Sequence, residues 1–147
     1  MRTKLFTTTK LMKKTTEKDH YIKLIFLLQE KQQRVTVSKL GQDLGVSKSS
    51  VSNMMKKLIN MGWVDTAPYK PIRLTELGEH IAIELVAKHR LVESFLCEVM
   101  YFTSDEVHEI AEELEHVNSP VFFRRIKEML SQIQKDPHGS SIPEIDF

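Results

Sequence analysis

The 147-residue sequence contains a single cysteine, Cys97, so no disulfide can form within the chain. Such a composition fits a reducing compartment, and we expect a cytoplasmic protein. The sequence has no apolar run near the roughly 20 residues that a membrane-spanning helix needs. Its first residues lack the apolar core of a secretory signal. These absences favour a globular protein without a membrane partner.

One half of the sequence has few acidic residues, and the other half has few basic residues. Residues 1–73 carry 15 lysines and arginines against 5 acidic residues, whereas residues 74–147 carry 6 against 15. The two net charges, about +10 and −9, nearly cancel in the total of +1. A basic surface attracts polyanions such as DNA, and an acidic surface attracts cations. The two halves therefore suit different partners.

The basic half contains the pattern of a helix-turn-helix motif. A first helix is expected over residues 17–31, where apolar residues recur at helical spacing. Ser38 is a candidate cap for a short helix over 38–44, and Ser47 for a second helix over about 48–60. A glycine between the two helices allows the tight turn that this motif requires.

A β-hairpin is expected after the second of these helices. Two short strands are predicted at 63–64 and 72–74, joined by a loop that contains two prolines. This hairpin would form the wing of a winged helix-turn-helix domain. We therefore predict a DNA-binding domain over residues 1–74, with a basic arm at its start.

The second helix of the motif has the composition of a recognition helix. Such a helix presents its first residues to base edges in the major groove. Asparagine there suits adenine, serine suits bases or phosphates, and lysines of the helix and wing suit the phosphate backbone. The candidate DNA contacts are Ser38, Lys48, Ser49, Ser50, Ser52, Asn53, Lys56, Lys57, Lys70 and Arg73. The alternative is a solvated helix in a winged domain that binds protein.

The acidic half is expected to be helical as well. Helices are predicted at about 76–100, 104–117 and 119–134, followed by an extended tail that is rich in proline, glycine and serine. The predicted fold is therefore mainly α.

Histidines and glutamates share helix faces in this acidic half. The candidates are Glu112, Glu115 and His116, with His108 one turn before them, and the pair His89 and Glu93. Imidazole and carboxylate are ligands of Mn(II), Fe(II), Co(II) and Zn(II). A bound ion would offset the repulsion among the carboxylates. The alternative is a charged helix face that is simply solvated.

The order of these elements and four segments resemble a known family. The segments TTEKDHYI, HRLVE, VHEIAEELEHV and DPHGSSIP are similar to those of the diphtheria-toxin-repressor and manganese-transport-regulator family of metal-activated bacterial repressors. The resemblance covers about residues 15–147. It implies two metal sites, one formed by His20, Glu112, Glu115 and His116 and the other by His89, Glu93 and His108.

Three positions depart from the family pattern. Glu112 replaces the cysteine of iron-type members, and a carboxylate there favours Mn(II) or Fe(II) over softer ions. His20 replaces methionine or aspartate, and Lys23 replaces a carboxylate of the manganese type, which argues against a two-ion manganese cluster. A histidine-rich site could also accept Zn(II) or Co(II). The sequence ends before the SH3-like domain of longer relatives, so a short form is expected.

The function implied by the resemblance is metal-dependent repression of transcription. The protein would be a homodimer that binds a palindromic operator in double-stranded DNA and controls metal-uptake genes. Residues 75–147 would form an all-helical dimerisation and metal-binding domain. Its apolar dimer surface would comprise Leu114, Val117, Val121, Phe122, Phe123, Ile126 and Leu130. The alternatives are a metal-independent winged-helix regulator and, from another class, a metalloenzyme with a histidine and glutamate site.

Overall fold

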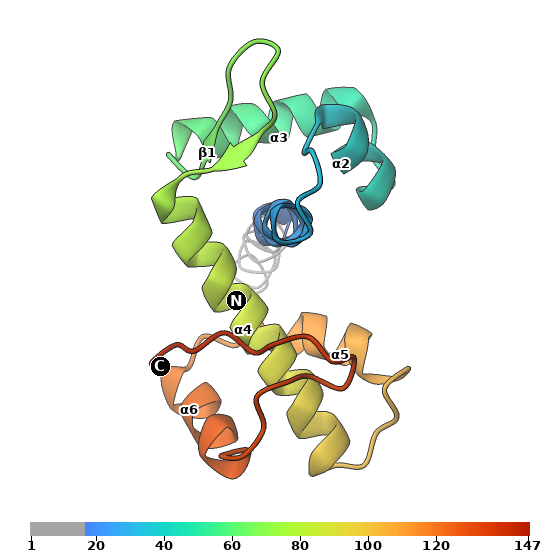
Figure 1. Cartoon of the computed structure of the whole chain (residues 1–147), viewed down its shortest axis with the longest axis vertical. Coiled ribbons are helices and arrows are strands. Elements are labelled where there is room, and N and C mark those ends of the chain that lie inside the picture. The colour runs from blue at the N-terminus through green and yellow to red at the C-terminus, as the bar shows by residue number, and fades with distance from the viewer. Residues whose placement is uncertain (1–16) are drawn as a thin grey trace, which may run out of the picture. The chain divides into compact units, whose positions relative to one another are not determined.

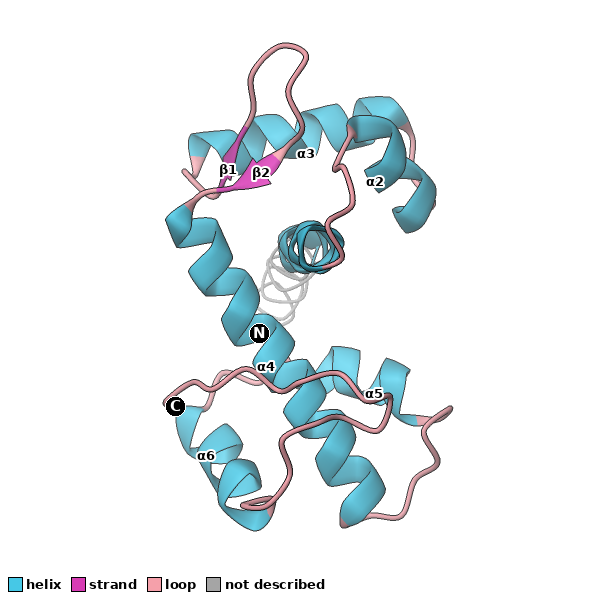
Figure 2. Cartoon of the chain, viewed as in Figure 1, coloured by secondary structure: helices cyan, strands magenta, loops and turns pink. Residues whose placement is uncertain are grey.

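A computed structural model describes residues 17–147, so the basic arm expected at the start of the chain lies outside the described residues. The chain divides into two compact units, one up to Ala82 and the other from Ile83 on (Figure 1). The boundary falls within one long helix, α4, Glu76–Glu98. Helices dominate both units (Figure 2), which confirms the predicted fold class.

The first unit contains the helix-turn-helix motif. Its first described helix covers residues 17–30, α2 is Val37–Leu44, and α3 is Lys48–Asn60. Gly45 ends α2 with a φ of 65°, and its amide donates to the carbonyl of Gly41. This left-handed conformation turns the chain sharply from α2 toward α3.

The caps of these helices are partly as predicted. Ser47 caps α3, and its hydroxyl accepts a hydrogen bond from the Ser50 amide at 3.1 Å. The expected Ser38 cap is wrong. Thr36 caps α2, and its hydroxyl accepts from the Lys39 amide at 3.1 Å. The reason is that the helix begins one residue earlier than expected, which leaves Ser38 inside its first turn.

The wing forms close to where it was predicted: its first strand begins and ends one residue later than predicted, and its second strand begins one residue later. Strand β1 is Val64–Asp65 and strand β2 is Arg73–Leu74. They pair antiparallel, with Val64 opposite Leu74 and Asp65 opposite Arg73. The seven residues between the strands form the loop at the tip of the wing.

The start of α4 packs against the end of the hairpin. The Thr75 amide donates to the Trp63 carbonyl at 3.0 Å, and the Thr75 hydroxyl accepts from the Gly78 amide at 3.1 Å. A Cβ atom at position 78 would lie 1.9 Å from the Trp63 carbonyl oxygen. Glycine at this position therefore allows α4 to start directly against the wing.

The first unit has its own apolar core. Its fully buried side chains include Ile22, Ile25, Leu40, Val51 and Leu58. Met54 and Met55 of α3 are buried in the same core. Burial of each such side chain stabilises the fold by roughly 1.5–3 kcal/mol, and it holds one face of α3 against the unit while the opposite face stays exposed.

The second unit contains the rest of α4, two shorter helices and the tail. Helix α5 is Val107–Leu114 and α6 is Pro120–Met129, so both are shorter than predicted. The Ser119 hydroxyl caps α6 by accepting from the Phe122 amide at 3.3 Å. The core of this unit includes Val92, Leu96, Val107, Ala111 and Phe123.

Part of the expected dimer surface lies inside this core. Phe123, Ile126 and Leu130 are buried within the single chain, so their assignment to a dimer surface is wrong. Their helical spacing marks an apolar face but does not distinguish a core within one chain from an interface between two. Val121 is exposed and remains available for such a surface.

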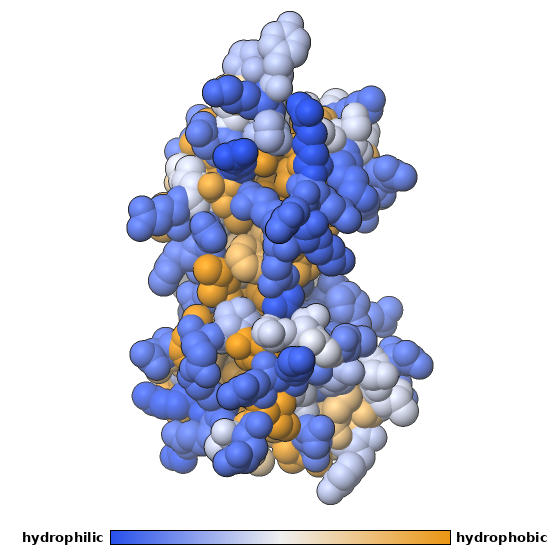
Figure 3. All heavy atoms as spheres, viewed as in Figure 1, coloured by the Kyte–Doolittle hydropathy of each residue, from blue (hydrophilic) through white to orange (hydrophobic). Residues whose placement is uncertain are grey.

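One face of the molecule has a mostly polar surface. The face drawn in Figure 3 is largely hydrophilic, with apolar side chains between the polar ones. Among the helices that the structure describes, none combines the length and apolarity that would let it cross a membrane.

Candidate metal centre

One buried carboxylate is the centre of the candidate site in the second unit. Glu93 on α4 is only 2% exposed. Its Oε1 lies 2.9 Å from Nε2 of His89 and 3.4 Å from Nδ1 of His108, and its Oε2 lies 3.2 Å from Nδ1 of His138. A buried carboxylate is unfavourable unless it is paired. Three imidazoles converging on it supply that pairing.

The surroundings of Glu93 keep it ionised. Burial raises the pKa of Glu93, but the hydrogen bond and charge of His89, the charge of His138 and the hydrogen bond of His108 outweigh burial, so the pKa lies below its ordinary value. The cluster therefore offers an anionic oxygen ligand together with imidazole nitrogens.

His89 lies between two carboxylates. Its Nε2 faces Glu93 at 2.9 Å, and its Nδ1 faces Oε2 of Glu115, which is 1% exposed, at 2.5 Å. Carboxylates only accept hydrogen bonds, so a ring that donates at both nitrogens is an imidazolium. With a metal at Nε2, the bond from Nδ1 to Glu115 would fix the orientation of the ring.

Helix geometry accounts for two members of the cluster. His89 and Glu93 are four residues apart on α4 and therefore share a face. His108 is in the first turn of α5, and its ring packs edge to face on His89 with a centroid separation of 5.1 Å. The structure brings together His89, Glu93 and His108, which the sequence analysis had grouped, and their role as metal ligands stays a prediction.

His138 in the tail was missed by the sequence analysis, as was its neighbour Asp136. The Asp136 carboxylate accepts from the His138 amide at 2.9 Å and from the Ser140 amide at 2.8 Å. Arg90 of α4 donates to the Ser141 carbonyl at 2.7 Å and holds the tail on the helix. The sequence signal for these two residues was an aspartate and a histidine close to a glycine in the segment DPHGSS. This segment has no helical or strand periodicity, so its sequence does not predict that it packs against α4.

These side chains form two overlapping groups that fit a divalent ion. One group is His89, Glu93 and His108, and the other is Glu93, Asp136 and His138. In each group, one ligand atom per residue lies within 4.8 Å of the others. Nitrogen and carboxylate oxygen donors of this kind suit Mn(II), Fe(II), Co(II) and Zn(II).

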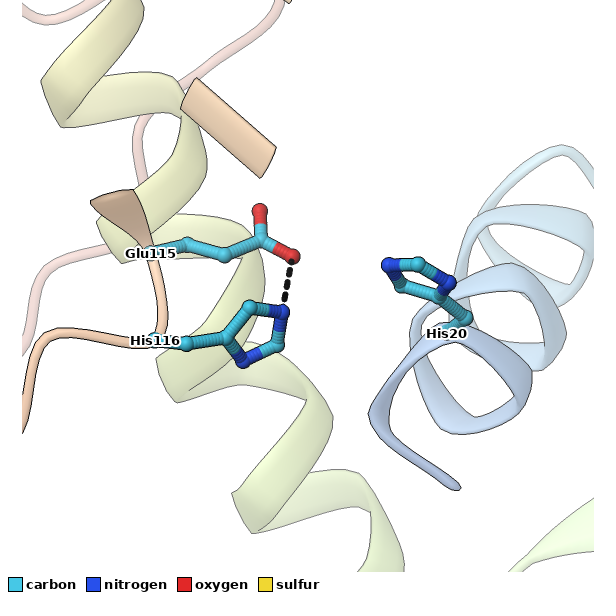
Figure 4. A group of neighbouring side chains, drawn as sticks. All are labelled: His20, Glu115 and His116. Carbon is cyan, nitrogen blue, oxygen red and sulfur yellow. Dashed lines mark ion pairs between the residues drawn. The ribbon is translucent and has the colours of Figure 1, made fainter. Parts of the chain in front are cut away.

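Two residues of the other predicted site, Glu115 and His116, lie beyond the end of the helix that was expected to carry them. Glu115 and His116 are adjacent, with His116 Nε2 at 3.4 Å from Glu115 Oε1 (Figure 4). Glu112 Oε1 lies 3.3 Å from His108 Nε2. Helix α5 ends at Leu114, so Glu115 and His116 follow its last residue and the shared helix face does not extend to them.

The remaining member of that predicted site is His20. It is carried by the first helix, in the other unit (Figure 4). Its role as a ligand stays a prediction.

The predicted DNA contacts lie on the exposed side of the first unit. Lys48, Ser49 and Ser50 are exposed in the first turn of α3, and Asn53 is exposed one turn later. Ser38, Lys56, Lys57, Lys70 and Arg73 are exposed, and Ser52 is half-buried. The Ser47 hydroxyl lies 3.1 Å from that of Ser49 and 2.9 Å from that of Ser50. A DNA partner would therefore share or replace bonds that already order this turn.

Two family models match the chain, one in each half. The N-terminal DNA binding domain of the iron dependent repressor matches residues 13–72. The metal binding and dimerisation domain of the same repressor matches residues 75–144. The two matched ranges are separated by residues 73–74, which form strand β2, and this is where the charge pattern divides the sequence.

Known proteins agree with these matches. The chain is 33% identical over 110 residues to an uncharacterised HTH-type transcriptional regulator of Methanocaldococcus jannaschii, which covers 74% of the chain and 88% of that protein. It is 30% identical over 123 residues to the diphtheria toxin repressor of Corynebacterium glutamicum, covering 84% of the chain and 54% of that protein. The chain thus spans about half the length of the diphtheria toxin repressors that it matches.

A solved structure supports the same assignment. A manganese-dependent transcriptional repressor in complex with manganese is 38% identical with a TM-score of 0.80, over 88% of this chain and 59% of that chain. The family consists of DNA-binding regulators and not of enzymes, so the metalloenzyme alternative is not supported. This chain belongs to the iron-dependent repressor family of metal-dependent transcriptional repressors.

Proposed function

We propose that this protein is a cytoplasmic repressor that binds its operator when Mn(II) or Fe(II) is bound. The observation that carries the proposal is the convergence of three imidazoles on the buried Glu93 carboxylate. A solvated helix face would not require a buried anion with three titratable partners. The exposed, lysine-containing face of α3 in the other unit supplies the surface for DNA.

The cluster around Glu93 is the metal site best supported by the geometry. His89, Glu93 and His108 would hold the ion, and His138 would add a ligand from the tail. Mn(II) and Fe(II) suit a site with carboxylate ligands, and Zn(II) or Co(II) would also be accepted. Among similar chains, one solved structure is a repressor in complex with manganese and another is ScaR with bound Zn²⁺.

The second metal site that we propose comprises His20, Glu112, Glu115 and His116. It rests on the sequence pattern and the family resemblance. Within the second unit, Glu115 contacts both His116 and His89. Because one carboxylate contacts both sets of ligands, we expect occupancy of one site to alter the affinity of the other.

Operator recognition is assigned to the start of α3. Asn53 and the serines of the first turn would read bases in the major groove, while Lys56, Lys57 and the wing would contact phosphates. A homodimer would place two such helices on a palindromic operator. Genes for metal uptake are the proposed targets.

The test is selection of binding sites from a pool of random duplexes at fixed salt. It is run with a chelator and then with Mn(II), anaerobic Fe(II) and Zn(II) in turn. We expect sequence-specific binding only with metal. Glu93→Gln should lose this response, because it removes the central anion but keeps its size. The matched control is Glu113→Gln, since Glu113 is an exposed carboxylate on α5.

The competing candidate is a metal-independent winged-helix regulator. It predicts equal affinity and specificity with chelator and with metal, and no metal in the purified protein. A wild-type protein that behaves in this way would overturn the metal-dependent function while leaving the DNA-binding assignment of α3 in place.

A further inference from the structure

The tip of the wing carries an aromatic side chain that the fold of this chain does not use. Tyr69 is 99% exposed and has a φ of 64°. The Lys70 amide donates to the Ala67 carbonyl at 3.0 Å, which closes a four-residue turn with Pro68 in its second position and Tyr69 in its third. A positive φ in the third position is the pattern of a type II turn, in which glycine or asparagine is favoured.

Neither packing nor backbone preference explains a tyrosine at this position. A side chain that is almost fully exposed contributes no burial, and an aromatic residue is disfavoured in the left-handed region. Glycine would satisfy the turn without strain. A residue that opposes both local preferences suggests a role outside the fold.

The charges around the tip indicate what partner it meets. Lys70 and Arg73 are exposed on the returning side of the loop, and Arg34 donates to the Tyr69 carbonyl at 3.4 Å. Asp65, the single acid of the hairpin, is paired in register opposite Arg73. An aromatic ring among cations suits a nucleic acid, because the cations contact phosphates while the ring contacts sugars or base edges.

The position of the wing within the first unit suits the same partner. The loop of the hairpin rises past α3 (Figure 1). When α3 occupies the major groove, the surface next to it along the duplex is the minor groove. Apolar side chains that enter this groove respond to its width and to the base pairs that line it.

We propose that Tyr69 is a DNA contact that enters the minor groove beside the α3 half-site, with Lys70 and Arg73 on the flanking phosphates. This inference rests on the proposed DNA-binding function and extends it. The wing thereby adds a preference for base pairs that α3 does not touch. The backbone of the turn presents the ring to the DNA, and the bond from Arg34 to the Tyr69 carbonyl steadies it.

The test compares Tyr69→Gly with Tyr101→Gly. Tyr101 is also exposed, at 87%, and also has a positive φ, 59°, but it lies in the acidic unit. Both changes place glycine at a position with a positive φ and so relieve backbone strain. Both variants should therefore fold at least as stably as the wild type. Affinity for a selected duplex is measured by fluorescence anisotropy with metal at fixed salt. The flanking G·C pairs are then replaced by inosine·C, which removes the minor-groove amino group.

We expect Tyr69→Gly to weaken binding about tenfold, which corresponds to about 1.4 kcal/mol, with an unchanged salt dependence because the ring carries no charge. It should also lose the response to flanking inosine, and Tyr101→Gly should retain the wild-type behaviour. Wild-type affinity and flank response in Tyr69→Gly would overturn the inference while the proposed function stands. A wild-type protein that binds no duplex under any metal condition would overturn both.

Discussion

Binding of a divalent metal to the Glu93 cluster should release at least one proton per chain near neutral pH. The prediction follows from His89, whose Nε2 and Nδ1 lie 2.9 Å and 2.5 Å from carboxylate oxygens of Glu93 and Glu115. A ring that donates hydrogen bonds to both carboxylates when the metal is absent carries two protons. Coordination at Nε2 requires that nitrogen to lose its proton.

The size of the effect follows from linkage. Release of one proton makes the apparent metal affinity rise about tenfold per pH unit, or about 1.4 kcal/mol, over the range in which the free ring is protonated. A second proton released from another ring of the cluster would make the rise about a hundredfold per pH unit.

The assay is isothermal titration of the metal-free protein with Mn(II) in buffers of different ionisation enthalpy. The slope of the observed enthalpy against the buffer enthalpy gives the number of protons released. Glu113→Gln should leave this number unchanged. His89→Gln should lower it by one and weaken binding. Strong binding by the wild type with a slope of zero would refute the assignment of His89 as an imidazolium.

Four further predictions concern stability, DNA binding and reactivity. Gly78→Ala should lower the free energy of unfolding by about 1–3 kcal/mol, because its Cβ would lie 1.9 Å from the Trp63 carbonyl oxygen; unchanged stability in chemical denaturation would contradict this contact. Lys57→Ala should weaken binding to all DNA sequences about equally and lower the salt slope by about 1; a selective loss for one sequence would instead indicate base contact. The free energy of unfolding of the metal-free protein should fall as the pH drops below 4.5 and through the lowered pKa of Glu93, since a carboxyl group with a depressed pKa stabilises the fold only while it is ionised. Glu93→Gln should make the free energy of unfolding less dependent on pH in this acid range. An equally steep pH dependence in Glu93→Gln would contradict the contribution of Glu93. Burial, and then nearby carboxylates, raise the pKa of Cys97, so iodoacetamide should modify it more slowly at pH 8 than it modifies free cysteine; faster modification would contradict this.

Local chemistry in the sequence was enough to predict the DNA-binding unit. A serine before a helix and a glycine after one act within a few residues, and Ser47 and Gly45 behave as expected. The four-residue spacing of His89 and Glu93 likewise predicted that they share a helix face. The predicted Ser38 cap was wrong by two positions, because Thr36 caps the helix, which begins at Val37.

Contacts that depend on irregular segments could not be predicted in this way. His138 reaches Glu93 from 45 residues away, through a tail that Asp136 and Arg90 hold in place. The spacing of Glu112 and Glu115 indicated one face, but α5 ends between them. Periodicity applies only as far as the helix continues, so the end of the helix decides which side chains meet.

We propose that metal and operator DNA bind to one coupled system. Coupling is reciprocal, so the factor by which Mn(II) strengthens DNA binding must equal the factor by which DNA strengthens Mn(II) binding. The most direct measurement is the Mn(II) affinity of the chain with and without a saturating selected duplex, at one pH and one salt concentration. We expect Mn(II) to bind more tightly in the presence of the duplex, by the same factor by which Mn(II) strengthens DNA binding. Equal Mn(II) affinities with and without DNA would contradict it.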